Sequence, residues 1–269
     1  MTSFRGESSS GEVARFVIAE AGPMQRAGEG PGVARRSLRL SLRNCYETLA
    51  ISVPTMIDAF GGRVTKAKSD TRLARWAHNI VVNADIHLEV HGREHMAPSE
   101  TYLVMSNHRS LYDIPVLFEV IGSNIRMITK RELFQVPIFG KALEAGGFIS
   151  IDRRNRHAAI RSLEQARALL ASGTHVWIAP EGTRSRTGEL LPFKKGAFYL
   201  AMDAGLPILP VTLIGTHQAL PAKGVRSTPG AHVRVQIHAP IDPAPYIAMG
   251  KPGRGRLMDH LRSVLESAL

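Results

Sequence analysis

The chain has 269 residues, of which 44% are hydrophobic and 6% aromatic, and 34 Lys and Arg residues against 23 acidic residues give a formal net charge of +11. This composition excludes a fibrous or wholly disordered chain, and the length allows one sizeable domain with accessory segments. The positive charge favours partners that carry negative charge, such as nucleic acid, anionic lipid headgroups or phosphorylated small molecules.

Cysteine content and hydropathy limit where the protein works. Cys45 is the single cysteine, so no disulfide can form within the chain and a reducing compartment is expected. The N-terminus lacks the apolar core of a secretory signal. No run of about 18 uncharged apolar residues predicts a spanning helix. If the protein meets a membrane, we expect it to lie on the cytoplasmic face.

The N-terminal part of the chain divides into two segments. Residues 1–34 are rich in Gly, Ser and Glu, which predicts a disordered tail because little apolar surface is available to offset the entropy of ordering. Residues 35–83 predict helices that mix basic and apolar residues, with an apolar run over 49–60 that is broken at Pro54. Basic residues, an apolar face and Trp76 suit a helix at an anionic membrane surface. A helical hairpin packed on the core explains the same pattern.

From residue 84 onwards, short apolar or alternating runs are separated by helical stretches. The runs predict strands at residues 86–90, 102–105, 125–128, 148–151, 176–178, 208–214 and 233–237. Helices are predicted at residues 158–171, at residues 196–204 and near the C-terminus. Strands that alternate with helices predict an α/β domain with helices packed on a sheet. We expect this domain over 84–240, followed by a loop and an amphipathic helix over 241–269.

A polar segment with an acid–base pattern directly follows the predicted strand 102–105. It contains His108 and, after four intervening residues, Asp113. If a helix begins near Ser110, the carboxylate can fold back to the imidazole, fix one tautomer and stabilise the imidazolium formed after proton capture. A second interpretation stays open, because Ser110 and Asp113 also have the spacing of a helix capping box.

Basic residues also follow two other predicted strands. Arg153 comes after the strand 148–151, and the segment Glu181, Gly182, Thr183 and Arg184 comes after the strand 176–178. The planar guanidinium group suits phosphate, and glycine lets the backbone approach a ligand closely. Each segment alone is also a common way for a chain to leave a strand.

Taken together and in this order, these segments resemble the glycerolipid acyltransferase family that includes 1-acylglycerol-3-phosphate acyltransferases. The Asn-His-x4-Asp block matches Asn107, His108 and Asp113, and the Pro-Glu-Gly-Thr-Arg block matches 180–184. A block that ends in arginine matches 148–153, and a strand punctuated by prolines matches 206–211. The resemblance spans roughly residues 84–240 and implies a mixed sheet flanked by helices, which forms the catalytic domain, preceded by a helical membrane-associating segment.

The resemblance implies a direct acyl transfer without a covalent acyl-enzyme. His108 would be the general base steadied by Asp113, and the donor would be a thioester of coenzyme A or of acyl carrier protein. The acceptor would be the hydroxyl of 1-acylglycerol-3-phosphate, which becomes phosphatidic acid. The substrate-binding residues would be Arg153, Glu181, Gly182, Thr183 and Arg184, with Lys130 as a weaker candidate. Neither a cofactor nor a metal is required.

Other interpretations of the sequence remain open. A sister acyltransferase would use another lysophospholipid, glycerol-3-phosphate or a lyso-aminolipid. A catalytically silent lipid-binding protein could share the fold. Nucleic acid is disfavoured as a partner because no recognisable motif is present and few aromatic residues are available for stacking. His87, Glu89 and His91 alternate on one predicted strand and imitate a metal site, but a solvated strand face explains them more simply.

Overall fold

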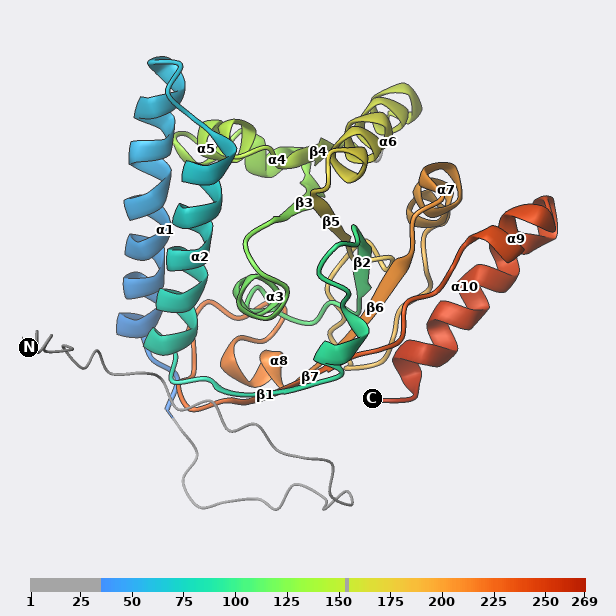
Figure 1. Cartoon of the computed structure of the whole chain (residues 1–269). Helices are drawn as coiled ribbons and strands as arrows, with labels where there is room; N and C mark the ends of the chain where they lie inside the picture. Colours follow the sequence, from blue (N-terminus) through green and yellow to red (C-terminus); the bar gives the residue numbers. More distant parts are fainter. Residues whose placement is uncertain (1–34, 153–154) are drawn as a thin grey trace, which may run out of the picture.

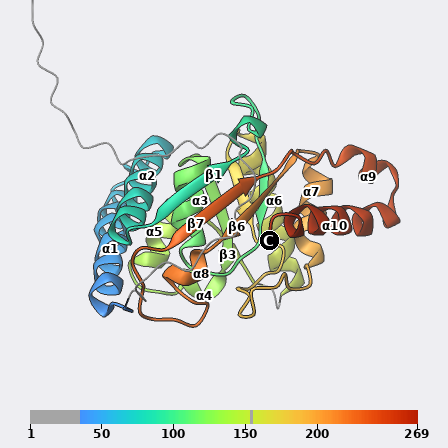
Figure 2. The same cartoon turned by 90° about the horizontal axis from the view of Figure 1, so that it is seen from below.

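The computed structural model describes residues 35–152 and 155–269. The tail predicted over 1–34 and the residue Arg153 lie outside the described residues. Within this part of the chain, a sheet of seven strands lies between layers of helices, as Figures 1 and 2 show from two directions. The predicted mixed α/β sheet flanked by helices is therefore confirmed.

The sheet has the strand order β1-β7-β6-β2-β5-β3-β4. All neighbouring strands pair in parallel except β6 and β7, so β1 and β7 run opposite to the other five strands. The strands are β1 (His87–His91), β2 (Leu103–Ser106), β3 (Ile125–Lys130), β4 (Ile149–Ile151), β5 (His175–Ile178), β6 (Ile208–Ile214) and β7 (His232–Ile237). The carboxyl ends of β2 to β6 consequently meet at one edge, where α/β proteins usually bind their ligands.

Helices cover both faces of the sheet. Figure 1 shows α1, α2 and α3 on one side and α6, α7 and α10 on the other. The helices are α1 (Leu38–Phe60), α2 (Lys66–Asn83), α3 (Asp113–Ile121), α4 (Arg131–Phe134), α5 (Phe139–Ala145), α6 (Arg156–Ala171), α7 (Lys195–Ala204), α8 (Thr216–Ala219), α9 (Ala244–Ala248) and α10 (Lys251–Glu266). A short 3-10 helix spans Arg93–His95.

Because side chains alternate along each strand, the sheet contributes residues to two apolar cores, one on each face. In β2, Val104 contributes to the core beneath α2 and α3, whereas Leu103 and Met105 contribute to the core beneath α6, α7 and α10. Successive strand residues point to opposite faces, so a strand buried on both faces must be apolar throughout. The sequence run at 102–105 has this composition, and all of its residues are at most 1% exposed.

The N-terminal segment forms two helices, α1 and α2, but one expectation for it is wrong. Helix α1 continues through Pro54 from Leu38 to Phe60 instead of breaking. Proline has no backbone N–H, so the carbonyl of Ala50, four residues earlier, loses its hydrogen-bond donor in the helix. Because Ala50 is exposed, water can take the place of that donor. Contacts with α2 hold α1 on both sides of the proline, at Thr48 and at Asp58, and α1 also packs against α5.

A buried arginine ties α2 to the sheet. Arg126 on β3 is 3% exposed, and its guanidinium lies 2.7 Å from the carboxylate of Asp70 on α2. The same side chain donates to the backbone carbonyls of Gly146, Ser123 and Ile125. The helical segment is thereby anchored to the strand that ends at Lys130. The division into segments 35–83, 84–240 and 241–269 stays a prediction.

Candidate functional site

The proposed acid–base pair is formed at the carboxyl end of β2. The Nδ1 atom of His108 lies 2.7 Å from Oδ2 of Asp113, and the two side chains are 15% and 0% exposed. Asp113 is the first residue of α3, so the helix begins three residues later than the expected start near Ser110. The bend over 107–112 returns the carboxylate to the imidazole, as the sequence predicted.

The capping-box interpretation is met only in part: the N-cap of α3 is Tyr112, which makes no side-chain cap hydrogen bond, and not Ser110, although Asp113 does accept from the backbone of Ser110. The Oδ2 atom of Asp113 accepts hydrogen bonds from the backbone N–H groups of Arg109 at 2.7 Å and Ser110 at 2.9 Å, in addition to its contact with His108. Backbone donors therefore fix the position of the acceptor that faces Nδ1. An imidazole that donates from Nδ1 leaves the lone pair of Nε2 free to accept a proton. One carboxylate oxygen therefore both holds the bend before α3 and fixes the tautomer of the imidazole.

Neighbouring side chains hold His108 in place. The ring of Trp177 meets the imidazole edge-on with centroids 5.4 Å apart, and its Nε1 donates to Ser106 Oγ at 2.8 Å. Asn107 is 1% exposed, and its amide group exchanges two hydrogen bonds with the backbone of Leu213 on β6. The sequence analysis did not give Trp177 and Asn107 these supporting roles, because they depend on which strands lie beside β2.

Glu181 connects the loop after β5 to the histidine loop. Its Oε1 accepts from the backbone N–H of His108 at 2.9 Å, and its Oε2 accepts from that of Leu191 at 2.9 Å. The side chain is buried at 1% exposure. Burial raises the pKa of the Glu181 carboxyl. The hydrogen bonds from the backbone N–H groups of Leu191 and His108, and the positive charges of the His108 and Arg109 side chains, partly oppose that rise. Glu181 therefore shapes the site from inside the protein, and its role in binding substrate stays a prediction.

This arrangement makes a prediction about stability and pH. Because the pKa of Glu181 is higher in the folded chain than in the unfolded chain, the folded chain binds a proton more readily. The resulting stabilisation is complete below the unfolded pKa and is lost as pH rises through the folded pKa. We expect the unfolding free energy of the wild type, relative to Glu181→Gln, to fall as pH rises from about 4 to about 8. Urea unfolding of both proteins across this pH range measures the difference in unfolding free energy. A difference that stays constant or rises with pH would contradict a raised pKa of Glu181.

The remaining predicted residues lie at the same edge of the sheet. Gly182 has a φ of 73°, a left-handed conformation that favours glycine at this turn. Thr183 is exposed and Arg184 is half-buried. Lys130 is exposed at the end of β3. Because β5 lies between β2 and β3, the ends of β2 and β3 are about 10 Å apart. Their contacts with substrate stay predictions, as does that of Arg153.

The three residues that imitate a metal site, His87, Glu89 and His91, make contacts that do not involve a metal ion. Nε2 of His91 lies 2.6 Å from the carboxylate of Glu89, and the ring of His87 stacks on His232 with centroids 4.7 Å apart. Among residues 35–152 and 155–269, no group of three or more His, Cys, Asp or Glu side chains is placed to hold a metal ion.

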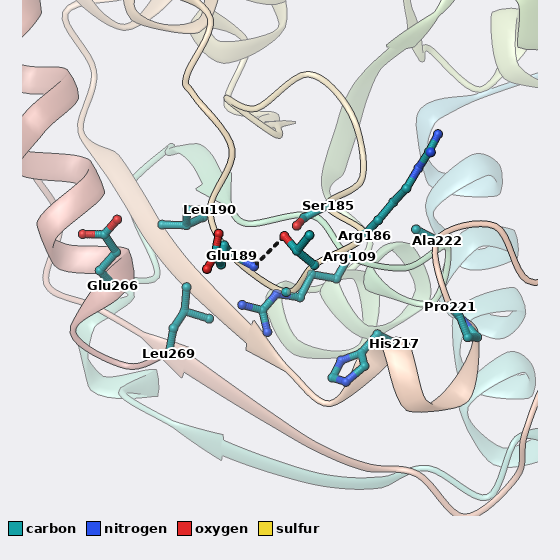
Figure 3. A pocket seen from close by; sticks show the side chains of 12 residues that line it. Arg109, Ser185, Arg186, Glu189, Leu190, His217, Pro221, Ala222, Glu266 and Leu269 are labelled. Atoms are coloured by element: carbon teal, nitrogen blue, oxygen red, sulfur yellow. Dashed lines mark hydrogen bonds between the residues drawn. The ribbon is translucent and has the colours of Figure 1, made fainter.

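A cavity of about 680 Å³ lies beside this site. Figure 3 shows its labelled lining residues, which come from the loops after β2, β5 and β6 and from the end of α10. Arg109 extends into the cavity, whereas Arg186 points away from it (Figure 3). His108 itself does not line the cavity. Sequence reasoning did not single out Arg109 or His217, which become neighbours only because β6 pairs with β2.

Comparison with known proteins supports the resemblance. A family model described as Acyltransferase matches residues 87–214, which include the acid–base pair and the loop after β5. These residues therefore form a domain that matches the Acyltransferase family. The resemblance inferred from the four sequence blocks is thereby confirmed.

Named relatives of this acyltransferase domain come from distant organisms. The 1-acyl-sn-glycerol-3-phosphate acyltransferase alpha of Mus musculus is 38% identical over 157 residues, which is 58% of this chain and 55% of that protein. The 1-acyl-sn-glycerol-3-phosphate acyltransferase of Cocos nucifera is 40% identical over 140 residues, 52% of this chain and 45% of that protein. The chain thus spans about half the length of the curated relatives it matches.

A solved structure shares the fold over most of its length. The 1-acyl-sn-glycerophosphate acyltransferase PlsC of Thermotoga maritima superposes with a TM-score of 0.65 at 25% sequence identity. The match covers 85% of this chain and 95% of that chain. It therefore extends beyond the family-model region of residues 87–214.

Proposed function

We propose that this chain transfers a fatty acyl group from an acyl thioester to the free hydroxyl of 1-acylglycerol-3-phosphate, giving phosphatidic acid. The observation that carries the proposal is the contact of His108 Nδ1 with Asp113 Oδ2 at 2.7 Å, at the ligand-binding edge of a domain in this family. The names of its relatives indicate the same reaction in those proteins.

The proposed reaction is one acyl transfer through a tetrahedral intermediate. Nε2 of His108 accepts the proton of the acceptor hydroxyl, whose oxygen attacks the carbonyl carbon of the thioester. The tetrahedral oxyanion then collapses, the carbon–sulfur bond breaks, and the departing thiolate takes the proton from the imidazolium. Asp113 keeps the imidazole oriented through both proton transfers.

The surroundings of His108 support direct transfer rather than an acyl-enzyme. The nearby hydroxyl of Ser106 donates to the carbonyl of Asn107, and that of Ser110 donates to the carbonyl of Leu220. In the described part of the chain, no Ser, Thr or Cys side chain is hydrogen-bonded to the His108 ring. A nucleophile activated by histidine requires that contact. The acceptor hydroxyl therefore takes the position of the nucleophile.

In this proposal, basic residues at neighbouring strand ends bind the acceptor's phosphate. Arg184 lies in the loop after β5 and Lys130 ends β3, so both belong to the same edge of the sheet as His108. A guanidinium group can bind phosphate through two parallel hydrogen bonds. Arg153 comes two residues after the end of β4 in the sequence and is proposed as the third ligand.

A comparison of acceptors tests this function against its alternatives. We expect phosphatidic acid from 1-acylglycerol-3-phosphate, with slower acylation of lysophosphatidylcholine, glycerol-3-phosphate and lyso-aminolipids. Faster acylation of one of these would replace the proposed acceptor by a sister substrate. Binding of all acceptors without transfer from coenzyme A or acyl carrier protein donors would favour a silent lipid-binding protein.

We also propose that the enzyme docks peripherally on an anionic membrane through α1, at the cytoplasmic face. The side of α1 that faces α2 is polar: Thr48 accepts from Trp76 Nε1 at 3.1 Å, and Asp58 pairs with Arg72 at 2.7 Å. The outer side carries a stripe of exposed apolar residues, which are Leu38, Leu42, Tyr46, Leu49, Val53, Ile57 and Phe60. Exposed apolar surface of this extent marks a docking site.

Two details of the helical segment bear on this docking. Trp76, expected at the lipid surface, instead packs edge-on against Phe118 and is hydrogen-bonded within the protein. No helix of the described residues is long and apolar enough to cross a membrane. A surface location also suits the chemistry, because a water-soluble thioester carrier and a lipid acceptor meet there.

Introducing negative charge into the apolar stripe tests the docking. The double variant Leu42→Glu and Leu49→Glu changes side chains that are 61% and 49% exposed, so the fold should persist. We expect at least a roughly tenfold weaker association with phosphatidylglycerol vesicles in co-sedimentation, because two apolar side chains no longer enter the bilayer. Val225→Glu, at a residue 78% exposed outside α1, is the matched control. Equal sedimentation of all three proteins would remove α1 from the docking surface.

A further inference from the structure

The cavity beside His108 has no part in the steps above. It lies over the carboxyl ends of β2, β5 and β6, between the loop over 185–190 and the segment of His217, Pro221 and Ala222 (Figure 3). Neither Arg184 nor Lys130, the acceptor's proposed phosphate ligands among the described residues, lines the cavity.

Two cationic residues, Arg109 and Arg186, line this cavity, and the side chain of Arg109 is the one that extends into it (Figure 3). Within the described residues its guanidinium has neither a hydrogen-bond partner nor an ion pair, and only its backbone N–H contacts Asp113. A β-carbon placed on Gly188 would lie 3.9 Å from the guanidinium, so the loop passes close beside it. Desolvation lowers the pKa of Arg109, although the charges of Glu181 and Asp113 oppose that effect. A half-buried cation without a partner is costly, and an anionic ligand would offset that cost.

Neutral donors line the same cavity. The hydroxyl of Ser185 is buried and has no hydrogen-bond partner in the described part of the chain. Burial and the charge of Arg109 lower the pKa of His217, which keeps its imidazole neutral and able to donate one N–H group. The acidic groups on the lining are Glu189, which is exposed, and Glu266, which is paired with Arg262 at 3.0 Å.

We propose that this cavity is a second phosphate subsite, in which Arg109 supplies the charge and Ser185 and His217 supply neutral donors. The inference rests on the proposed function, in which both substrates carry phosphate. The acceptor has a phosphomonoester, and the thioester donor carries phosphate at the end of its pantetheine arm, as a diphosphate in coenzyme A and as a phosphodiester in acyl carrier protein. A phosphate at Arg109 would not use Arg184 or Lys130, because neither of them lines the cavity.

Substitution of Arg109 tests the subsite without disturbing the acid–base pair, because the hydrogen bond to Asp113 comes from the backbone. Steady-state kinetics of Arg109→Gln should show a KM for one substrate raised about 10- to 100-fold, the effect of losing a charge-assisted hydrogen bond. We expect kcat to fall less than KM rises, and Arg109→Lys to restore part of the affinity. A raised KM for acyl-coenzyme A assigns the subsite to the donor, and a raised KM for the lysolipid assigns it to the acceptor.

Two controls separate the subsite from general electrostatic attraction. Arg186→Gln removes one positive charge from the same rim, but that exposed side chain points away from the cavity (Figure 3). An equal KM increase in Arg186→Gln, or unchanged KM values in Arg109→Gln, would overturn the proposal. Binding of 4′-phosphopantetheine and of pantetheine, measured calorimetrically, provides a readout that needs no turnover. For a donor subsite, only the wild type should prefer the phosphorylated compound.

The outcomes also separate this inference from the proposed function. An active wild type whose KM values do not respond to Arg109→Gln refutes the subsite alone. A wild type that is inactive with every donor and acceptor refutes the proposed function. In that case the binding measurement still decides whether Arg109 recognises phosphate.

Discussion

Replacing His108 by alanine should lower kcat/KM for acyl transfer by about 10²- to 10⁴-fold, the usual contribution of a positioned general base. The chain should stay folded, because the removed imidazole sits at the open end of β2 and is 15% exposed, whereas the core beneath it is unchanged. Steady-state acyl transfer measures the loss, and circular dichroism with thermal unfolding measures the fold.

A second histidine provides the control for this variant. His157 is exposed on α6, on the opposite side of the sheet from α3, so His157→Ala should keep activity within about twofold of the wild type. A folded His108→Ala protein that turns over at the wild-type rate would exclude His108 as the base.

Replacing Asp113 by asparagine should lower kcat by a comparable factor while leaving KM nearly unchanged. The amide has one acceptor oxygen, whereas Oδ2 of Asp113 meets the imidazole and two backbone N–H groups. If the amide N–H₂ faces the imidazole, Nδ1 must accept instead of donate, and the proton then resides on Nε2, where the base must be unprotonated. We expect about a 10²-fold loss or more.

The same substitution should also reduce stability by about 1–3 kcal/mol, because Asp113 is fully buried at the first turn of α3. Activity must therefore be measured well below the thermal midpoint. Asp203→Asn, at an exposed residue paired with Arg167, controls for loss of a surface carboxylate. If Asp113→Asn loses stability but keeps a normal kcat, the role of Asp113 is structural only.

Much of the fold could be predicted from local patterns. The runs at 102–105 and 176–178 are apolar throughout because their strands are buried on both faces, and their short length, not a period, distinguishes them from buried helices. The helix break at Pro54 could not be judged from the sequence, since contacts of α1 with two other helices override a local preference. The antiparallel placement of β7 against β6 likewise depends on tertiary pairing.

The candidate site was predictable where its chemistry is local in sequence. His108 and Asp113 are held together by one bend, so their spacing sufficed. Glu181 was expected to shape the phosphate pocket, and its buried contact with the His108 backbone could not be read from the chain. The cavity residues His217 and Arg109 are far apart in sequence, and only the pairing of β2 with β6 brings their loops together.

Acyl transfer by the wild-type chain itself tests the central claim most directly. Labelled acyl-coenzyme A and 1-acylglycerol-3-phosphate are supplied in mixed micelles, with acyl carrier protein thioester as a second donor, and the lipid products are separated. The account predicts labelled phosphatidic acid from the wild type and only a trace from His108→Ala. Absence of labelled phosphatidic acid with both donors, from a folded protein that binds the micelles, would contradict it.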